Sequence, residues 1–439
     1  MPPDFKVGMR ENFKMSISHR IQPWLVVFSA SLFFFFEFMQ VNMFNALDPS
    51  LYLAFHLTNS TALGQLSASY MYAIVLFLFP AGMILDRFST RGLIIAAMIA
   101  CVTCTLLFSF ATHLWQAFIC RLVTGFGGAF CLLSCVRLAS RWFSPKKMAL
   151  VVGLIVTFAM IGGMMAQTPF TKLIQLYGWR NTLRIDAIAG YVMLGIIILF
   201  VRDYPVGQHL MSEHLHNSLE KTGFWITLKS VIMNLQNWIA GIYTSLVNLP
   251  VFLLGSTWGS WYLVQTQNCS RINASYVTSM LFIGMIIGSP ALGWISDRLN
   301  QRKKPMIWGA IASFVVIMII MYMPHLSFVD LLVLFFALGF VISAQIISYP
   351  LVAESNPSVL TATAEGLASV LIMAGGFTIP VFPALLNMYW DHSMHRGIPL
   401  YSVNNYRLAF WIMPIAFILA FVAALYVKET RCRSFEESH

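Results

Sequence analysis

The sequence predicts an all-α protein that crosses a membrane many times. Of its 439 residues, 58% are hydrophobic and only 10% are charged. A soluble protein of this length needs far more charge on its surface. Apolar runs of about 20 residues, each long enough to cross the ~30 Å hydrocarbon layer, recur along the whole chain. The 12 Trp and 15 Tyr fit belts at the two membrane surfaces, because their rings are apolar and their tips polar.

The apolar runs predict twelve transmembrane helices. The longest polar stretch, residues 202–236, separates the sixth helix from the seventh, and we expect its three His to be solvated and not to bind a metal. Within it, residues 229–238 have an amphipathic pattern that predicts a segment lying flat on the membrane. The expected helices span residues 24–46, 63–85, 92–112, 114–140, 147–173, 181–201, 237–265, 273–295, 304–324, 327–353, 362–390 and 406–427.

The net charge of +10 does not indicate nucleic-acid binding. Lys and Arg gather in short loops at one end of the expected helices, and no separate basic domain is present to hold a duplex. By the positive-inside rule, this bias places both termini in the cytoplasm. We expect a multi-pass protein of a bacterial inner membrane, with a eukaryotic endomembrane as the alternative. Most of the seven Cys lie inside apolar runs and indicate no disulfide framework.

Two short segments, about half the chain apart, share the pattern G-x-x-x-D-R-x-x-x-R after a long apolar run. Its residues are Gly82, Asp86, Arg87 and Arg91 in the first segment and Gly293, Asp297, Arg298 and Arg302 in the second. The pattern resembles the loop 2–3 and loop 8–9 signature of the major facilitator superfamily, and the resemblance covers nearly the full length. It implies two pseudo-symmetric six-helix bundles, at residues 1–201 and 237–439, joined by a linker at 202–236. It also implies transport of a small solute by alternating access.

The resemblance gives the repeated acid a mechanical role. Asp86 can face the start of helix 11 in the other bundle, and Asp297 can face the start of helix 5 in the same way. Helix N-termini carry partial positive charge and free N–H groups, so each carboxylate stabilises a contact that closes the cytoplasmic gate. The nearby Arg side chains would brace the loops. The alternative is that these charges only set the topology.

Helix 4 carries a second resemblance, because Arg121 begins a match to the family's R-x-x-x-G-x-G motif. An Arg inside the membrane is costly unless it is paired or hydrated. Glu37 of helix 1 is the candidate partner, since a rise of 1.5 Å per residue puts both side chains at about the same depth in a ~30 Å membrane. Gln40 follows Glu37 by one turn, and Tyr70 of helix 2 reaches a similar level.

Three roles are open for this group. Glu37 can be a proton site whose affinity depends on Arg121 and on access to solvent. Alternatively, Arg121 can bind a substrate carboxylate, with Glu37 as its counter-ion or as the site for an ammonium group. The third possibility is a permanent structural ion pair. Ionisable residues within a membrane are functional by default, which favours the first two.

Helices 7 and 10 supply further candidates. In the resembled family, helices 1, 4, 7 and 10 line the cavity, so Trp258, Trp261, Tyr262 and Gln345 are candidate substrate contacts. For the Trp residues the alternative is an anchor in the interfacial belt, and for Gln345 it is a hydrogen bond between helices. The runs around these residues resemble a branch of carriers that includes lysosomal dipeptide and bacterial nutrient transporters.

Motifs of other classes are missing from the sequence. It contains no G-x-x-x-x-G-K-[ST], which disfavours an ATP-driven pump, and no H-E-x-x-H or G-x-S-x-G, which disfavours a membrane hydrolase. We therefore expect no enzyme and no cofactor, but a monomeric, proton-coupled carrier of an amino acid, peptide or organic acid. Its partners would be this small-molecule substrate, the proton and the lipid bilayer. The alternatives are efflux of amphipathic compounds and a receptor that binds a solute without moving it.

Overall fold

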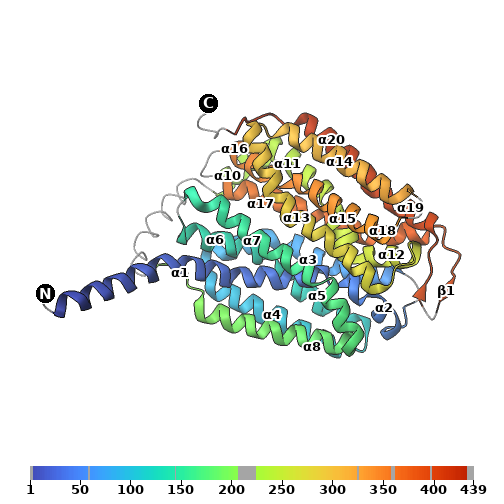
Figure 1. The fold of residues 1–439 in the computed structure, drawn as a ribbon, viewed down its shortest axis with the longest axis horizontal. Coiled ribbons are helices and arrows are strands. Elements are labelled where there is room, and N and C mark those ends of the chain that lie inside the picture. The colour runs from blue at the N-terminus through green and yellow to red at the C-terminus, as the bar shows by residue number, and fades with distance from the viewer. Residues whose placement is uncertain are drawn as a thin grey trace.

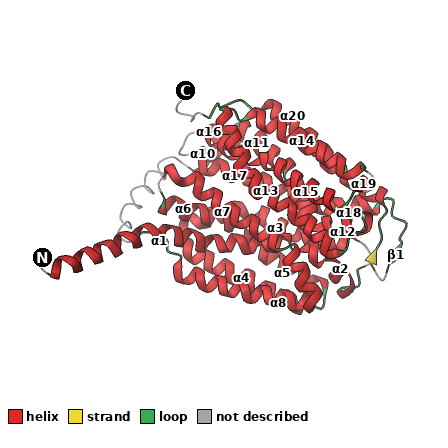
Figure 2. Ribbon diagram, in the orientation of Figure 1, coloured by secondary structure: helices red, strands yellow, loops and turns green. Residues whose placement is uncertain are grey.

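A computed structural model shows a chain that is almost entirely helical (Figure 2). It describes residues 3–57, 60–143, 145–205, 224–323, 326–356, 361–395 and 398–432. Within these ranges, the undescribed side chains are those of residues 3–20, 79, 83, 86, 87, 140, 145–150, 224–228, 361–363, 365 and 395. The two halves of the chain form two groups of helices side by side, and both termini lie at the same end, which we call the terminal end (Figure 1).

The N-terminal half begins with a helix that extends beyond the body of the protein (Figure 1). Its helices are α1 (Pro3–Asn42), α2 (Phe44–Ala54), α3 (Ser60–Arg87), α4 (Thr90–Phe110), α5 (Leu114–Gly128), α6 (Cys131–Trp142), α7 (Pro145–Met165) and α8 (Thr168–Phe200).

The C-terminal half contains more short helical segments and a small antiparallel hairpin. Its helices are α10 (Phe224–Met233), α11 (Leu235–Val247), the π-helix η1 (Val251–Trp258), α12 (Gly259–Thr266), α13 (Arg271–Leu299), α14 (Lys303–Tyr322), α15 (Phe328–Ile342), the 3-10 helix η2 (Ser343–Ile347), α16 (Ser348–Glu354), α17 (Thr361–Ala374), the 3-10 helix η4 (Gly375–Phe377), α18 (Thr378–Asn387), α19 (Val403–Phe410) and α20 (Ile412–Tyr426). The hairpin pairs β1 (Met394–His395) with β2 (Ile398–Pro399).

The described residues contain eleven helical stretches long and apolar enough to cross a membrane. One of them, residues 151–200, has 50 residues, whereas about 20 residues suffice for one crossing. Its backbone leaves the helical conformation at Gly178, where φ is +78°. Trp142 Nε1 donates to the carbonyl of Arg202 at 3.0 Å, so the chain enters and leaves this stretch at the same end. It therefore crosses twice, and the predicted twelve crossings are confirmed.

The two halves repeat one pattern of helix packing. In the N-terminal half, α1 packs on α7, α3 on α5, and α4 on α8. In the C-terminal half, α11 packs on α17, α13 on α15, and α14 on α20. In each half, therefore, the first membrane crossing packs on the fifth, the second on the fourth, and the third on the sixth. The predicted pair of pseudo-symmetric six-helix bundles is therefore confirmed.

The region between the bundles is described only in part. Residues 206–223 of the expected linker lie outside the described residues. The segment 229–238, expected to lie flat on the membrane, contains the end of α10 and the start of α11. Asn234 separates these helices, and its side chain caps α11 by accepting from the backbone N–H of Gln236 at 3.0 Å.

Two predicted helices are interrupted at the end opposite the termini. Helix 1 stops at Asn42 and resumes as α2, and helix 7 contains the π-helix η1. Pro49 lies within α2, and Pro250 directly precedes η1. Proline cannot donate a backbone hydrogen bond, which frees the carbonyl four residues earlier. The sequence predicted both segments as continuous helices, without these interruptions.

Hydrogen bonds across the two bundles lie at this opposite end. Asn45 Nδ2 donates to the carbonyl of Leu254 at 2.7 Å, and Gln167 Nε2 donates to that of Gly255 at 2.8 Å. Further along the boundary, Asn387 Nδ2 donates to Thr61 Oγ1 at 2.8 Å. At the terminal end, no hydrogen bond or ion pair joins the bundles among the described residues. This state is therefore closed at the opposite end.

Close packing within the N-terminal bundle makes a testable prediction. A Cβ atom at Gly125 would lie 2.3 Å from the backbone oxygen of Tyr70, whereas one at Gly195 meets nothing within 4 Å. We expect Gly125→Ala to destabilise the protein by about 1–3 kcal/mol through overpacking. Gly195→Ala should be neutral or stabilise it by about 0.5–1 kcal/mol. Thermal unfolding in detergent compares the two; equal stabilities would contradict the described packing.

Candidate functional site

The structure brings together the four polar residues predicted in the N-terminal bundle. Glu37 and Gln40 lie on α1, Tyr70 on α3 and Arg121 on α5, and none is more than 2% exposed. The Tyr70 hydroxyl donates to Glu37 Oε2 at 2.7 Å. Arg121 Nη1 donates to the backbone carbonyl of Gln40 at 3.0 Å. Glu37, Tyr70 and Arg121 thus lie at the same level, as the depths estimated from the helical rise predicted.

Arg121 and Glu37 do not form the direct ion pair that the sequence suggested. Among the described residues, no ion pair within 4.0 Å joins them. Instead the Arg121 guanidinium lies between two aromatic rings, 4.8 Å from the centre of Phe44 and 4.7 Å from that of Tyr70. Cations are attracted to the faces of such rings. Tyr70 therefore contacts both partners, and a permanent ion pair is wrong for this state.

Two further polar residues, which sequence reasoning missed, complete the group. Gln40 Nε2 donates to Asp186 Oδ2 of α8 at 2.6 Å, and the Thr105 hydroxyl of α4 donates to Gln40 Oε1 at 3.2 Å. Asp186 is only 4% exposed. The rule that singled out Glu37, an acid within an apolar run, applies equally to Asp186. We call Glu37, Gln40, Tyr70, Arg121 and Asp186 the acid–arginine cluster.

The acid–arginine cluster is not fully hydrogen-bonded within the described part of the chain. Glu37 Oε1, Asp186 Oδ1 and Arg121 Nε are buried atoms without a partner there. Burying an ionised carboxylate without a partner costs much more free energy than burying a protonated one. The arrangement can therefore bind and release a proton at either carboxyl group, with one fixed positive charge nearby.

Glycines of α5, the first part of the fourth membrane crossing, make room for the acid–arginine cluster. A Cβ at Gly128 would lie 2.5 Å from the Tyr70 hydroxyl and 3.0 Å from Glu37 Oε2. A Cβ at Gly127 would lie 2.3 Å from Cys101 Sγ of α4. The small residues after Arg121 thus let α1, α3 and α4 approach α5 close to Glu37.

The two Trp of helix 7 lie inside the protein at the closed end. Trp258 is 0% exposed and stacks on Phe382, with ring centres 5.7 Å apart. Trp261 is 3% exposed, and its ring lies 5.0 Å from that of Tyr52 in the other bundle. An anchor in the interfacial belt must face lipid, so that alternative is wrong for both. Trp261 thus lies at the boundary between the bundles, and Trp258 packs beside it within the C-terminal bundle.

The described contacts of Tyr262 and Gln345 lie within the C-terminal bundle. The Tyr262 hydroxyl donates to the carbonyl of Ile320 at 2.9 Å, and its ring packs on Phe410 at 4.7 Å. Both partners belong to the C-terminal bundle, which favours a packing role for Tyr262. Gln345 lies in the 3-10 segment η2, where its backbone carbonyl accepts from the Thr244 hydroxyl at 3.3 Å. Its side chain has no hydrogen bond to a described residue.

The second loop motif is held by a buried arginine. Arg302 Nη1 donates to Asp297 Oδ1 at 2.6 Å, and Nη2 donates to Glu354 Oε1 at 2.7 Å. Burial alone would lower the pKa of Arg302, but hydrogen bonds and charges from Glu354 and Asp297 raise it above its usual value. Asp297 thus pairs within its own bundle in this state. Arg298 is exposed and lies 5.0 Å from the ring of Trp294.

The first loop motif is described only in part. Asp86 and Arg87 end α3, but their side chains lie outside the described residues. Arg91 Nη2 donates to the carbonyl of Ile198 at 2.8 Å, which ties the loop to helix 6. A Cβ at Gly82 or at Gly293 would meet nothing within 4 Å. Neither glycine of the repeated motif is therefore packed against the other bundle in this state.

A second acidic repeat, which sequence reasoning missed, supports both loops. Asp203 follows helix 6 and accepts from the backbone N–H of Arg91 at 3.0 Å and from Arg141 Nη1 at 3.4 Å. Glu429 follows helix 12 and accepts from the backbone N–H of Arg302 at 2.8 Å and of Lys303 at 3.0 Å. The sequence signal is a repeated triplet, valine, a basic residue and an acid, at residues 201–203 and 427–429.

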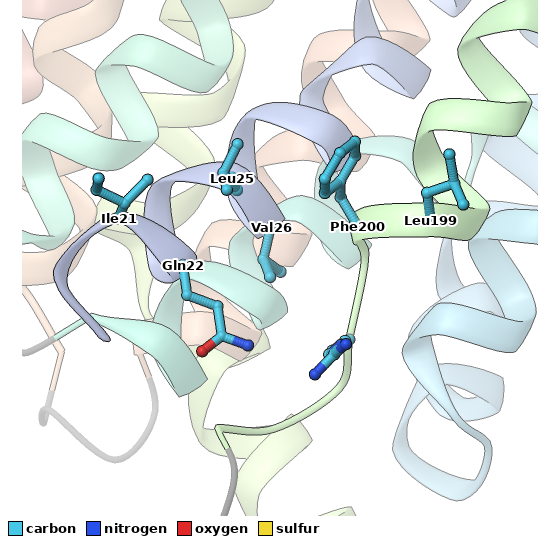
Figure 3. Close-up of a pocket in the computed structure, with 7 residues that line it drawn as sticks. Ile21, Gln22, Leu25, Val26, Leu199 and Phe200 are labelled. Carbon is cyan, nitrogen blue, oxygen red and sulfur yellow. The ribbon is translucent and has the colours of Figure 1, made fainter. Parts of the chain in front are cut away.

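A surface pocket of about 370 Å³ lies at the terminal end, beside the last turn of helix 6 (Figure 3). Its lining is Ile21, Gln22, Leu25, Val26, Leu199, Phe200 and Arg202. These residues come from one bundle and include none of the predicted site residues, so we assign the pocket no role in transport.

The comparison with known proteins identifies the family. The family model of the Major Facilitator Superfamily matches residues 30–380 and 240–437. The chain belongs to this superfamily and is a multi-pass membrane transporter by family, as the loop motifs indicated.

Among curated proteins, the membrane sensor protein UhpC of Salmonella typhimurium is 25% identical, over 76% of this chain and 78% of that protein. The gentisate transporter of Corynebacterium glutamicum is 23% identical, over 84% of this chain and 82% of that protein. Among solved structures, a D-xylose-proton symporter has a TM-score of 0.73 at 15% identity, over 94% of this chain and 100% of that one. At that identity the last match supports the fold alone.

The contact between Tyr70 and Glu37 leads to a second prediction. Tyr70→Phe removes the hydroxyl that donates to Glu37 but keeps the ring beside Arg121. A hydrogen bond to a carboxylate favours its charged form, so without it we expect the pH profile of transport to move to higher pH. Tyr72→Phe is the matched control, because among the described residues the Tyr72 hydroxyl donates only to Gln65, at an exposed site. Identical pH profiles for both variants would exclude the hydrogen bond from the mechanism.

Proposed function

We propose that the protein is a proton-coupled carrier of a small solute that bears a carboxylate, such as an amino acid, peptide or organic acid. The observation that carries this proposal is the acid–arginine cluster, in which two carboxyl groups and one guanidinium are buried in the N-terminal bundle. The named activity of one relative, transport of gentisate, concerns an organic acid and agrees with this substrate class.

The proton step follows from the surroundings of Glu37. In this state, which is closed at the opposite end, the carboxyl group of Glu37 is buried. One of its oxygens is bonded to Tyr70, and the other has no partner among the described residues. Access to water on one side would stabilise the ionised form, and burial would favour proton uptake. A solute carboxylate near Arg121 would compete for the same positive charge. Proton and solute binding are then linked through one guanidinium.

The gate step follows from the distribution of contacts between the bundles. In this state hydrogen bonds join the bundles at the opposite end, and among the described residues none joins them at the terminal end. We propose that the terminal end faces the cytoplasm, as the loop charges predict, so that this state is open inward. In the outward-open state, Gly82 and Gly293 would face the other bundle, and Asp86 and Asp297 would bind the starts of helices 11 and 5.

Substituting Glu37 tests the proton step. Glu37→Gln mimics the protonated form, so it should abolish accumulation driven by a pH gradient in proteoliposomes but retain exchange between equal pools of solute. The exposed carboxyl of Asp391 provides the control, and Asp391→Asn should behave as the wild type. Arg121→Ala should impair both assays, because it removes the charge that the carboxyl groups and the solute share. Accumulation by Glu37→Gln in response to a pH step would place the coupling site elsewhere.

The gate is tested by Asp86→Asn. A charge at a helix N-terminus contributes about 0.3–1 kcal/mol, and up to ~2 kcal/mol when partly buried. Its loss shifts a two-state equilibrium several-fold towards the inward-open state. We expect lower transport at nearly normal expression, and weaker labelling of cysteines introduced at the opposite end. Unchanged labelling and unchanged uptake would reduce the motif to a topology signal.

A second candidate function is solute sensing, because one relative is named a membrane sensor protein. A sensor would bind the solute without moving it. Counterflow in proteoliposomes decides between the two, since only a carrier exchanges labelled solute inside for unlabelled solute outside. The gate motifs in both halves favour the carrier, because a protein that does not cycle has no need of a gate.

A further inference from the structure

A third buried carboxyl group lies where the two bundles meet at the opposite end. Asp48 belongs to α2, which packs against η1, α12 and β2 of the other bundle. Asp48 is 0% exposed, and neither of its carboxyl oxygens has a hydrogen-bond partner among the described residues. Asp48 is thus covered by the same contact that must break when this end opens.

The charged and titratable groups around Asp48 form no ion pair or hydrogen bond with it in the described structure. Arg271 of α13 is the cation that acts on it, but it forms no ion pair with Asp48 in the described structure and donates to the carbonyl of Ala46 at 2.6 Å. The other titratable neighbours are Tyr52 on the same helix and Tyr406 of α19. Burial raises the pKa of Asp48 well above its usual value, and Arg271 opposes this by less.

Two polar aromatic groups beside Asp48 are also unpartnered. The Tyr52 hydroxyl and Trp261 Nε1 are buried without hydrogen bonds to described residues. Their rings lie 5.0 Å apart across the boundary between the bundles. This contact thus lacks the dense hydrogen bonding found around Asn45 and Gln167. Water entering between the bundles would reach three unsatisfied polar groups at once.

From this geometry we propose that Asp48 is a second proton-binding site, separate from the acid–arginine cluster, which keeps the opposite end closed while protonated. An ionised carboxylate without a partner is costly in a buried contact, so closure requires the neutral form. Opening hydrates the group and allows it to ionise near Arg271. The pH on the opposite side of the membrane would then set the balance between closed and open states. The inference rests on the alternating access of the proposed function but not on Glu37.

Distance measurements between the bundles test this site. Spin labels at Leu53→Cys and Tyr389→Cys, both exposed positions at the opposite end, report the separation by electron–electron double resonance. The half-buried native cysteines, Cys104, Cys269 and Cys432, are replaced by serine. For otherwise wild-type protein, we expect a longer distance to gain population, by several-fold, between pH 5 and pH 8. Asp48→Asn should keep the short distance at both pH values.

Two further variants separate this inference from the proposed function. Asp330→Asn changes an exposed acid at the start of α15 and should retain the wild-type response. Glu37→Gln should also retain it, even if proton-driven accumulation is lost. A pH response that persists in Asp48→Asn, or a wild-type protein without a response, would overturn the inference. Loss of the response in Glu37→Gln alone would overturn it too, and would assign the titration to the acid–arginine cluster.

Thermal stability gives an independent measurement. A carboxyl group that is neutral when folded and ionised when unfolded makes the folded state bind more protons, so stability falls as pH rises above the ordinary aspartate range. Asp48→Asn should therefore raise the melting temperature more at pH 8 than at pH 5. An equal change at both values, or a lower melting temperature at pH 8, would contradict a neutral Asp48 in the closed state.

Discussion

The interior of a membrane protein offers no bulk water to charged groups, and the acid–arginine cluster is arranged around that constraint. Arg121 keeps its charge between two aromatic rings and a backbone carbonyl, while the carboxyl groups of Glu37 and Asp186 each bond through one oxygen. The helix α5 supplies both the positive charge of Arg121 and the glycines that let neighbouring helices approach. In the proposed mechanism the guanidinium keeps its charge, and the protons and a solute carboxylate are the parts that change.

Hydrogen bonds, and not apolar packing alone, join the two bundles at the closed end. At the closed end, the amide side chains of Asn45 and Gln167 donate to backbone carbonyls of the π-helix η1. Such polar contacts exchange for water at modest cost. At the terminal end each bundle is braced internally by its own acidic and basic residues, as Arg302 with Glu354 shows. Each bundle can therefore move as a rigid unit, which alternating access requires.

The sequence predicted the fold and part of the site, for different physical reasons. The lengths of the apolar runs and the repeated loop motif predicted the twelve crossings. The rise per residue of a helix predicted that Glu37, Tyr70 and Arg121 lie at one level. Asp186 was missed because it closely follows Arg184 and so looked like the polar end of a helix, although Asp186 itself is buried. Asp48 was missed because it lies just beyond residue 46, the predicted end of helix 1. The π-helix depends on Asn45 and Gln167 from the other bundle, and no local pattern reveals such partners. The roles of the chosen residues stay predictions.

The central claim is that proton movement and solute movement are one process. The most direct test is to record both in the same proteoliposomes, with a pH-sensitive dye outside and a panel of labelled amino acids, peptides and organic acids. The account predicts that one class of solute, on entering, makes the medium more alkaline in a fixed ratio to the solute moved. Solute uptake with no accompanying change in pH, under conditions where the dye detects an added proton carrier, would contradict it.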